Sequence, residues 1–125
     1  MRKVRNFVNG QHVDAKDGRT LALVNPATGE EFGTSPLSSA ADVDAAMSSA
    51  AAAFDEWKDT TPSERSRALL RIADALESRA DELIALEVEN TGKPVAMTAS
   101  EEIPPMIDQI RFFAGAGRML ERSEE

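Results

Sequence analysis

The stretch TPSERSRALLRIADALESRADELIALEVENTGKP, residues 61–94, is the longest run in this chain whose apolar residues recur at a single period. Apolar residues recur in it at every third or fourth position, which places them on one face of a helix. These residues are Leu69, Ile72, Leu76, Ala80 and Leu83. Charged residues fill most of the other positions. The pattern predicts one long amphipathic helix whose apolar face must be covered by another part of the protein.

Both ends of this predicted helix carry end signals. Thr61 and Glu64 are spaced as a capping box, with Pro62 at a first-turn position where its missing N–H costs nothing. Gly92 can adopt the left-handed conformation that ends a helix, and Pro94 cannot continue one. The helix is therefore expected to lie between Thr61 and Pro94.

The first 37 residues carry turn signals between short β-prone segments. Asn9-Gly10 lies between two such segments and favours the type I′ turn of a hairpin. A further strand is expected over 20–24, followed by a turn at 25–30 and a short strand from Glu31. We predict a small antiparallel β unit, which needs helices or another sheet to pack against.

Two further helices are expected. A capping box at Ser39 and Asp42 predicts a helix over about residues 40–57. Its predicted buried residues are Val43, Met47, Ala50, Phe54 and Trp57. After a looser stretch that follows Pro94, a third helix is expected to begin close to Ile103. Its predicted buried residues are Ile103, Ile107, Ile110 and Ala114.

Composition narrows the classes of function. Fourteen basic and 22 acidic residues give a net charge of −8, which disfavours binding to nucleic acid or to an anionic membrane. No run approaches the ~18 apolar residues of a membrane span and no apolar segment follows the basic N-terminus, so we expect a cytoplasmic protein. The absence of cysteine excludes disulfides, thiolate metal sites and thiol nucleophiles from this chain.

No set of residues forms a complete catalytic site by pattern alone. The single histidine, His12, has no partner at metal-ligand spacing, which is typical of a surface strand residue. The segment 115–117, Gly-Ala-Gly, lacks the preceding strand and the third glycine of a dinucleotide fingerprint. Glu101 and Glu102 allow two interpretations. They could favour a cationic ligand, or they could supply negative charge at a helix N-terminus.

Five short segments form one pattern through their order and their separations along the chain. They are Phe7-Val8-Asn9-Gly10, Val24-Asn25-Pro26-Ala27-Thr28-Gly29-Glu30, the helix end from Phe54 to Trp57, Leu86-Glu87 through Thr91-Gly92-Lys93-Pro94, and Phe112-Phe113-Ala114-Gly115. As a set they resemble the N-terminus of NAD(P)-dependent aldehyde dehydrogenases, up to about Leu120. The segment from Glu102-Ile103-Pro104 to Arg111 is most similar to the branch that oxidises ω-aminoaldehydes such as 4-aminobutanal.

The resemblance implies an α/β fold, the Rossmann-like aldehyde dehydrogenase fold. This chain would be its N-terminal part, a small antiparallel β unit followed by three α-helices. The implied divisions are a β-hairpin unit at 1–37, the helical part of an incomplete nucleotide-binding domain at 38–121 and a polar tail at 122–125. The family oxidises an aldehyde to a carboxylic acid with NAD or NADP, through a thiol that this chain lacks. We therefore expect a truncated product or a fragment that neither catalyses the reaction nor binds the cofactor alone.

The resemblance also assigns two sets of site residues. Glu102, with Glu101 beside it, matches acidic residues at the substrate entrance of aminoaldehyde enzymes. The main-chain carbonyl of Val24 and the side chain of Asn90 match ligands of a structural Na⁺ or K⁺ in some members, with an amide at Asn90 in place of a carboxylate. The resemblance assigns no catalytic or cofactor-binding residue to this chain.

The alternative function is a non-catalytic helical interaction module derived from the same family. Helices that cover a sheet in the family would expose their apolar faces where that sheet is absent, and exposed apolar area drives association. We therefore expect self-association through two helix faces. One carries Val43, Met47 and Phe54, and the other carries Ile103, Ile107 and Ile110.

Overall fold

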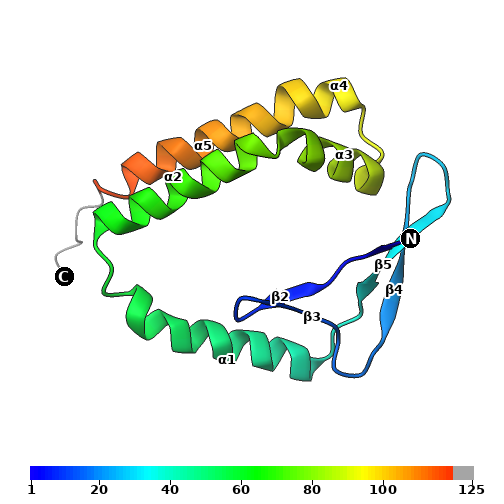
Figure 1. Cartoon of the computed structure of the whole chain (residues 1–125), viewed down its shortest axis with the longest axis horizontal. Helices are drawn as coiled ribbons and strands as arrows, with labels where there is room; N and C mark the ends of the chain where they lie inside the picture. Colours follow the sequence, from blue (N-terminus) through cyan, green and yellow to red (C-terminus); the bar gives the residue numbers. More distant parts are fainter. Residues whose placement is uncertain (120–125) are drawn as a thin grey trace. The chain divides into compact units, whose positions relative to one another are not determined.

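A computed structural model of the chain describes residues 1–119 (Figure 1). The chain divides into two compact units, Met1–Asp59 and Thr60–Glu125. The first unit contains the strands and one helix, and the second is helical. The predicted polar tail at 122–125 lies outside the described residues.

The first unit contains two small sheets. Their strands are β1 (Arg2–Lys3), β2 (Asn6–Val8), β3 (Gln11–Val13), β4 (Thr20–Val24) and β5 (Glu31–Pro36). β2 and β3 form the predicted hairpin, and Asn9 and Gly10 have the positive φ angles, 51° and 75°, that a type I′ turn requires. β4 pairs antiparallel with β5, as expected from the turn between them.

The prediction of a purely antiparallel unit is wrong at β1. This strand pairs parallel with β5, which gives the second sheet the order β1-β5-β4. The close approach depends on Gly33, because a Cβ there would lie 2.5 Å from the carbonyl oxygen of Arg2. A pairing of this kind joins residues 31 positions apart in the chain, and two charged residues carry no alternating pattern that could announce it.

Helix α1 (Ala40–Trp57) has the predicted bounds but not the predicted burial. Its first turn is capped by Asp42, whose Oδ2 accepts the N–H of Ser39 at 2.8 Å. The predicted buried residues Val43, Met47, Ala50, Phe54 and Trp57 are all exposed. The half-buried positions are instead those of Asp42, Ala45, Ala46 and Ser49. Helical spacing identifies an apolar face correctly here, but it does not establish that anything covers that face.

The second unit contains five helical segments. They are α2 (Pro62–Ser78), α3 (Ala80–Thr91), α4 (Val95–Met97), the π-helix η1 (Thr98–Glu102) and α5 (Ile103–Ala116). The predicted single helix over 61–94 is wrong, because Arg79 leaves the helical conformation with φ −117° and ψ 22°. At the break the hydroxyl of Ser78 donates to the carbonyl oxygen of Ala75 at 2.9 Å, a local bond that competes with regular helix.

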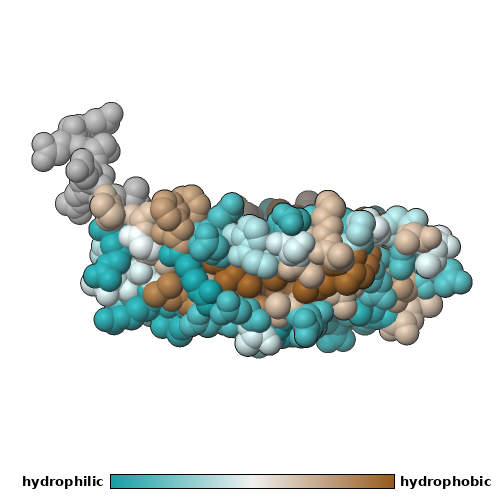
Figure 2. Space-filling model, turned by 90° about the horizontal axis from the view of Figure 1, so that it is seen from above, coloured by the Kyte–Doolittle hydropathy of each residue, from teal (hydrophilic) through white to brown (hydrophobic). Residues whose placement is uncertain are grey.

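The core of the second unit lies between α2 and α5. Ala73, Ile103 and Ile107 form its buried centre. Half-buried hydrophobic residues surround them: Leu76, Ala80, Leu83, Ile84, Met106 and Ile110. The predicted buried face of α5 is therefore confirmed, and it does not lie open for self-association. Figure 2 shows hydrophobic side chains as a band between hydrophilic ones.

One residue of the predicted α2 face is misplaced. Ile72 is 50% exposed, whereas its neighbour Ala73 is completely buried. A small side chain at the contact allows two helices to approach closely, so Ala73 rather than the larger Ile72 faces α5. Among the described residues, no helix is long and apolar enough to span a membrane.

Candidate functional site

A group of charged side chains of the second unit lies where α3 ends and the chain turns back toward α5. The left-handed conformation of Gly92, with φ 73°, ends α3 as predicted. Pro94 then caps α4, and its carbonyl oxygen accepts bonds from both the N–H and the hydroxyl of Thr98, at 3.1 and 3.2 Å. Thr98 is fully buried, so the turn is anchored from inside.

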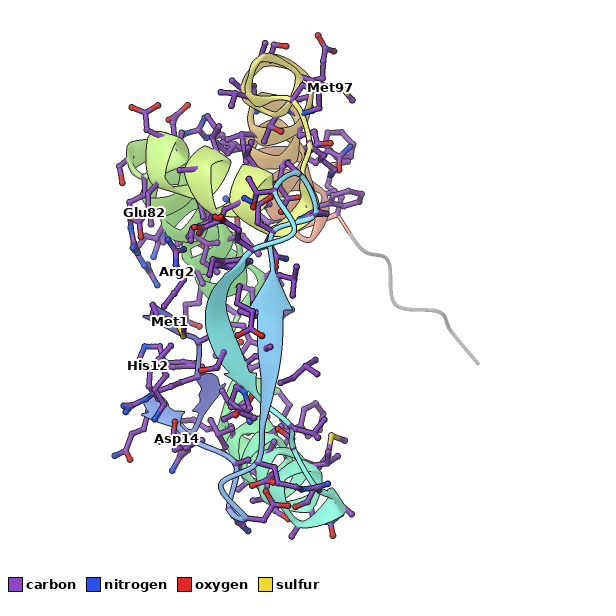
Figure 3. The ribbon with its side chains drawn as sticks, turned by 90° about the vertical axis from the view of Figure 1, so that its right-hand side faces the viewer. Met1, Arg2, His12, Asp14, Glu82 and Met97 are labelled. Atoms are coloured by element: carbon purple, nitrogen blue, oxygen red, sulfur yellow. The ribbon has the colours of Figure 1, made fainter. Side chains whose placement is uncertain are left out.

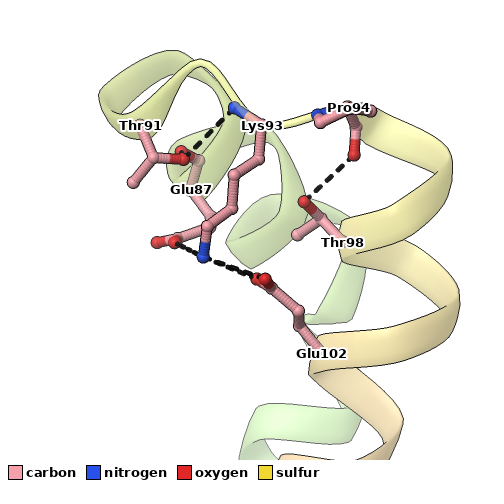
Figure 4. A network of polar contacts seen from close by, with 6 residues as sticks. All are labelled: Glu87, Thr91, Lys93, Pro94, Thr98 and Glu102. Atoms are coloured by element: carbon pink, nitrogen blue, oxygen red, sulfur yellow. Dashed lines mark hydrogen bonds and ion pairs between the residues drawn. The ribbon is translucent and has the colours of Figure 1, made fainter.

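Lys93 holds this group together (Figure 4). Its Nζ lies 3.0 Å from Oε1 of Glu87 on α3 and 2.9 Å from Oε1 of Glu102, the last residue of η1. It also donates to Oε2 of Glu102 at 3.0 Å. We call Glu87, Lys93 and Glu102 the Lys93 cluster. One ammonium group thus joins two segments that are 15 positions apart in the sequence.

The Lys93 cluster carries a net charge of −1. The hydrogen bonds that Lys93 donates to Glu102 and then to Glu87 raise the pKa of Lys93 above its ordinary value, because they favour the ammonium form. The three side chains keep between 32% and 39% of their surface exposed, and water therefore screens the pairs. The cluster can attract a cation weakly and position the turn.

The structure places the two predicted entrance residues in different surroundings. Glu102 is half-buried, and Lys93 engages both of its carboxylate oxygens. Glu101 is exposed, and its Oε1 accepts a longer bond of 3.3 Å from the hydroxyl of Ser100. The backbone runs from η1 into α5 without a cap at Glu102. The carboxylate of Glu102 therefore forms an ion pair with Lys93 and does not cap α5.

The two residues assigned to a monovalent cation lie in different units of the chain. Val24 ends β4 in the first unit, and Asn90 lies in the last turn of α3 in the second. Both residues are exposed. Two neutral oxygens fall short of the six to eight oxygen ligands that a hard cation such as Ca²⁺ takes. The cation site stays a prediction.

Other candidate groups in the described part of the chain do not assemble a reactive centre. No group of three His, Asp or Glu side chains among residues 1–119 could hold a metal ion. His12, labelled in Figure 3, lies exposed on β3, and its ring is 5.2 Å from that of Phe7. This position agrees with the interpretation of His12 as a surface strand residue.

Sequence reasoning missed Lys93. No pattern in the sequence assigns an ion pair to Lys93, because the spacing rule for ion pairs on helices covers partners three or four positions apart. Glu87 and Glu102 are six and nine positions from Lys93. The partners meet because the chain reverses direction after the left-handed turn at Gly92.

Known proteins account for nearly the whole chain. The aldehyde dehydrogenase family model matches residues 12–125. This chain belongs to the aldehyde dehydrogenase family. The Lys93 cluster and all the predicted site residues of this aldehyde dehydrogenase chain lie within the matched range.

Solved structures show the same relationship. A putative aldehyde dehydrogenase from Burkholderia cenocepacia is 35% identical and covers 94% of this chain, with a TM-score of 0.91. An NAD-dependent aldehyde dehydrogenase from Sinorhizobium meliloti is 38% identical over 96% of this chain, with a TM-score of 0.90. The NAD⁺ complex of an aldehyde dehydrogenase from Bacillus cereus is 31% identical over 91% of this chain, with a TM-score of 0.87.

These matches also show how much of the family fold is present. The aldehyde dehydrogenase chain described here spans 24% of the length of each of these three structures. Its small β segments followed by helices correspond to the N-terminal part of the aldehyde dehydrogenase fold, as predicted.

Proposed function

We propose that this chain supplies the N-terminal part of an oxidoreductase that converts an aldehyde to a carboxylic acid with NAD or NADP. The observation that carries the proposal is the family match over residues 12–125, supported by structural likeness to an enzyme named as NAD-dependent. The chain has no cysteine that could act as the nucleophile. We therefore propose that it is not catalytic alone and does not bind the dinucleotide alone.

A chimeric enzyme tests this proposal. This chain replaces the matching segment of the Sinorhizobium meliloti enzyme, with which it is 38% identical. We expect the chimera to fold and to oxidise aldehydes with NAD, whereas the separate 125-residue chain shows no turnover and no NAD binding tighter than millimolar by calorimetry. A folded but inactive chimera, or turnover by the separate chain, would contradict the proposal.

At a finer level, the substrate we propose is an ω-aminoaldehyde such as 4-aminobutanal. A carboxylate attracts an ammonium group by roughly 1 to 4 kcal/mol at ~4 Å, depending on screening by water, and does nothing comparable for an uncharged aldehyde. Lys93 already neutralises part of the charge of Glu102. Glu101, bonded only to a neutral hydroxyl in the contacts described above, is the more available of the two carboxylates.

Charge-removing variants of the chimera test the substrate class. We expect Glu101→Gln and Glu102→Gln to raise KM for 4-aminobutanal several-fold, with a larger rise for Glu101→Gln and at low salt, and to leave pentanal nearly unchanged. Glu30→Gln, in an exposed turn of the first unit, is the matched control. Equal effects on both aldehydes would remove the substrate role. That result would leave the activity of the chimera, and hence the broader proposal, unaffected.

The alternative of a non-catalytic interaction module is favoured by one observation. Val43, Met47 and Phe54 of α1 are 54%, 66% and 60% exposed and lie at helical spacing, so they present an apolar face to solvent. Under this alternative function, the chain would self-associate through this face. An inactive chimera together with association that requires these residues would favour the module over the enzyme part.

A further inference from the structure

Strand β4 has hydrogen-bonding groups that no other strand of the first unit uses. The sheet order β1-β5-β4 places β4 at an edge, paired only with β5. Figure 3 shows β4 as the blue arrow beside β5, with no further strand along its other side. Such an edge is a template for pairing with another chain.

The ladder shows which backbone groups point to the open side. Thr34 of β5 stands opposite Ala22, but its carbonyl oxygen accepts the N–H of Val4 at 2.8 Å, on the β1 side. Thr34 and Ala22 therefore form a non-hydrogen-bonded pair, and the N–H and C=O of Ala22 point away from β5. At the strand's start, Leu37 donates to the carbonyl oxygen of Arg19 at 2.9 Å, which fixes the same alternation.

Thr20 and Val24 share the orientation of Ala22. Pro36, opposite Thr20, has no N–H to offer. The register shift near Val24 places the extra residue, Phe32, on β5, so the alternation along β4 continues unbroken. The open edge of β4 thus presents the backbone groups of Thr20, Ala22 and Val24, and all three residues are exposed.

The side chains of β4 do not protect this edge. The strand TLALV contains no charge and no proline, and Leu21 and Val24 are 55% and 48% exposed. The other edge strand of the same sheet, β1, has only two residues, and both are charged. Short length and charge are the usual means by which edge strands avoid pairing, and β4 has neither.

We propose that β4 is the docking site for a second copy of this chain, paired antiparallel about a two-fold axis at Ala22. Ala22 then stands opposite Ala22 of the partner subunit, and Thr20 stands opposite Val24 of the partner subunit. Each copy contributes three outward N–H groups, so the pairing forms six hydrogen bonds and joins two three-stranded sheets into one.

A second copy fits this edge better than an arbitrary extended peptide. The sequence is self-complementary in the two-fold register, since Leu21 meets Leu23 of the partner subunit on one face and the smallest side chain lies at the axis. No like charges oppose each other. Two-fold symmetric pairs are also the commonest assemblies of identical chains. The inference concerns the first unit alone and does not rest on the proposed activity.

The test combines oligomeric state with hydrogen exchange in the whole 125-residue chain. Sedimentation is expected to show a monomer–dimer equilibrium. Amide exchange measured by NMR should slow with protein concentration at Thr20, Ala22 and Val24. It should not change at Leu21 and Leu23, whose N–H groups already face β5. Alternate protection of this kind distinguishes edge pairing from association through a helix face.

Charge variants at the axis sharpen the test. We expect Ala22→Lys and Ala22→Glu, each alone, to raise the dissociation constant of the dimer roughly tenfold or more, because like charges meet at the axis. An equimolar mixture of the two variants should restore dimers, which also shows that both variants fold. The control is Ala27→Lys, in an exposed turn. The N–H of residue 27 donates to Oδ1 of Asn25, and this bond does not involve the side chain of residue 27.

Several outcomes would overturn the proposal. A wild-type chain that stays monomeric at millimolar concentration has no such docking site. A dimer that Ala22→Lys leaves intact uses another surface, and the face of α1 is then the first to test. Concentration-dependent protection at every β4 amide, or at none, would likewise exclude the two-fold edge pairing, and binding of an unrelated extended peptide in preference to a second copy would exclude the proposed occupant.

Discussion

Helices α1 and α5 carry apolar residues at the same spacing, but only α5 buries them. Ile107 of α5 is 4% exposed, whereas Met47 of α1 is 66% exposed. α5 lies against α2, a second amphipathic helix with Ala73 at the contact. Helical periodicity therefore predicts an apolar face, whereas burial also requires an opposing surface of matching length.

The first unit offers α1 a much smaller partner. The β2–β3 hairpin, through Phe7 and the turn at Asn9, lines a groove with the alanine side of α1, at Ala46 and Ala53. A two-stranded hairpin covers only a narrow strip of a helix, and the strip it covers here carries small side chains. The larger apolar residues of α1 therefore face solvent.

The largest expected effect is in the core of the second unit. We expect Ile107→Ala to lower the free energy of unfolding by about 2–4 kcal/mol, because it leaves a cavity between α2 and α5. The measurement is urea denaturation followed by circular dichroism. Met47→Ala, at the corresponding kind of position on α1, should change the value by less than about 0.5 kcal/mol. Similar losses for the two variants would refute the contrast between the helices.

The helix caps should behave alike in the two units, because capping is local. Glu64 donates its N–H to Oγ1 of Thr61 at 3.2 Å, and Ser39 is joined to Asp42 at the start of α1. We expect Thr61→Ala and Ser39→Ala each to cost about 1 kcal/mol in thermal unfolding. The matched control is Thr61→Ser, which keeps the hydroxyl and should be nearly neutral. A large effect in one unit alone would show that tertiary context, not local chemistry, sets the strength of the cap.

The same caps predict a loss of stability in acid. The N–H of Ser39 holds the pKa of Asp42 below its ordinary value of 3.8, and the N–H of Thr61 holds the pKa of Glu64 below 4.5. A lowered carboxylate pKa stabilises the folded chain above the unfolded-state value, and that stability is lost as the pH falls through the folded-state value. We therefore expect Tm to fall below about pH 4.5, and to fall less in the double variant Asp42→Asn/Glu64→Gln. An identical pH profile for the double variant would contradict this.

The smallest expected effect on stability comes from the exposed face of α1. Met47→Ser with Phe54→Ser should change the free energy of unfolding by less than about 0.5 kcal/mol, since neither residue is buried. Binding of a hydrophobic dye should decrease at the same time, because the apolar face is interrupted. The matched control replaces Asp44 of the same helix by Ser. Unchanged dye binding in the double variant would show that the dye reports another surface.

Features that depend on neighbours along the chain could be predicted from the sequence. The Asn9-Gly10 hairpin, the caps at Ser39 and Thr61 and the left-handed stop at Gly92 follow from local backbone and side-chain chemistry, which acts over a few residues. The looser stretch expected before Ile103 is wrong, because the chain is helical from Val95 into α5. The resemblance to the family could also be found from short segments, because their order and spacing can be compared without knowing how they pack. The family match confirms it.

The features that join distant residues could not be predicted from local patterns. The burial of Ala73 in place of Ile72, the parallel pairing of β1 with Gly33, and the bond of Lys93 to Glu102 each depend on which surfaces meet. Such contacts are selected by packing energy summed over many residues, and a periodic pattern does not specify the partner. The exposed face of α1 has the same cause, because a pattern of apolar residues records what a helix can bury and not what lies against it.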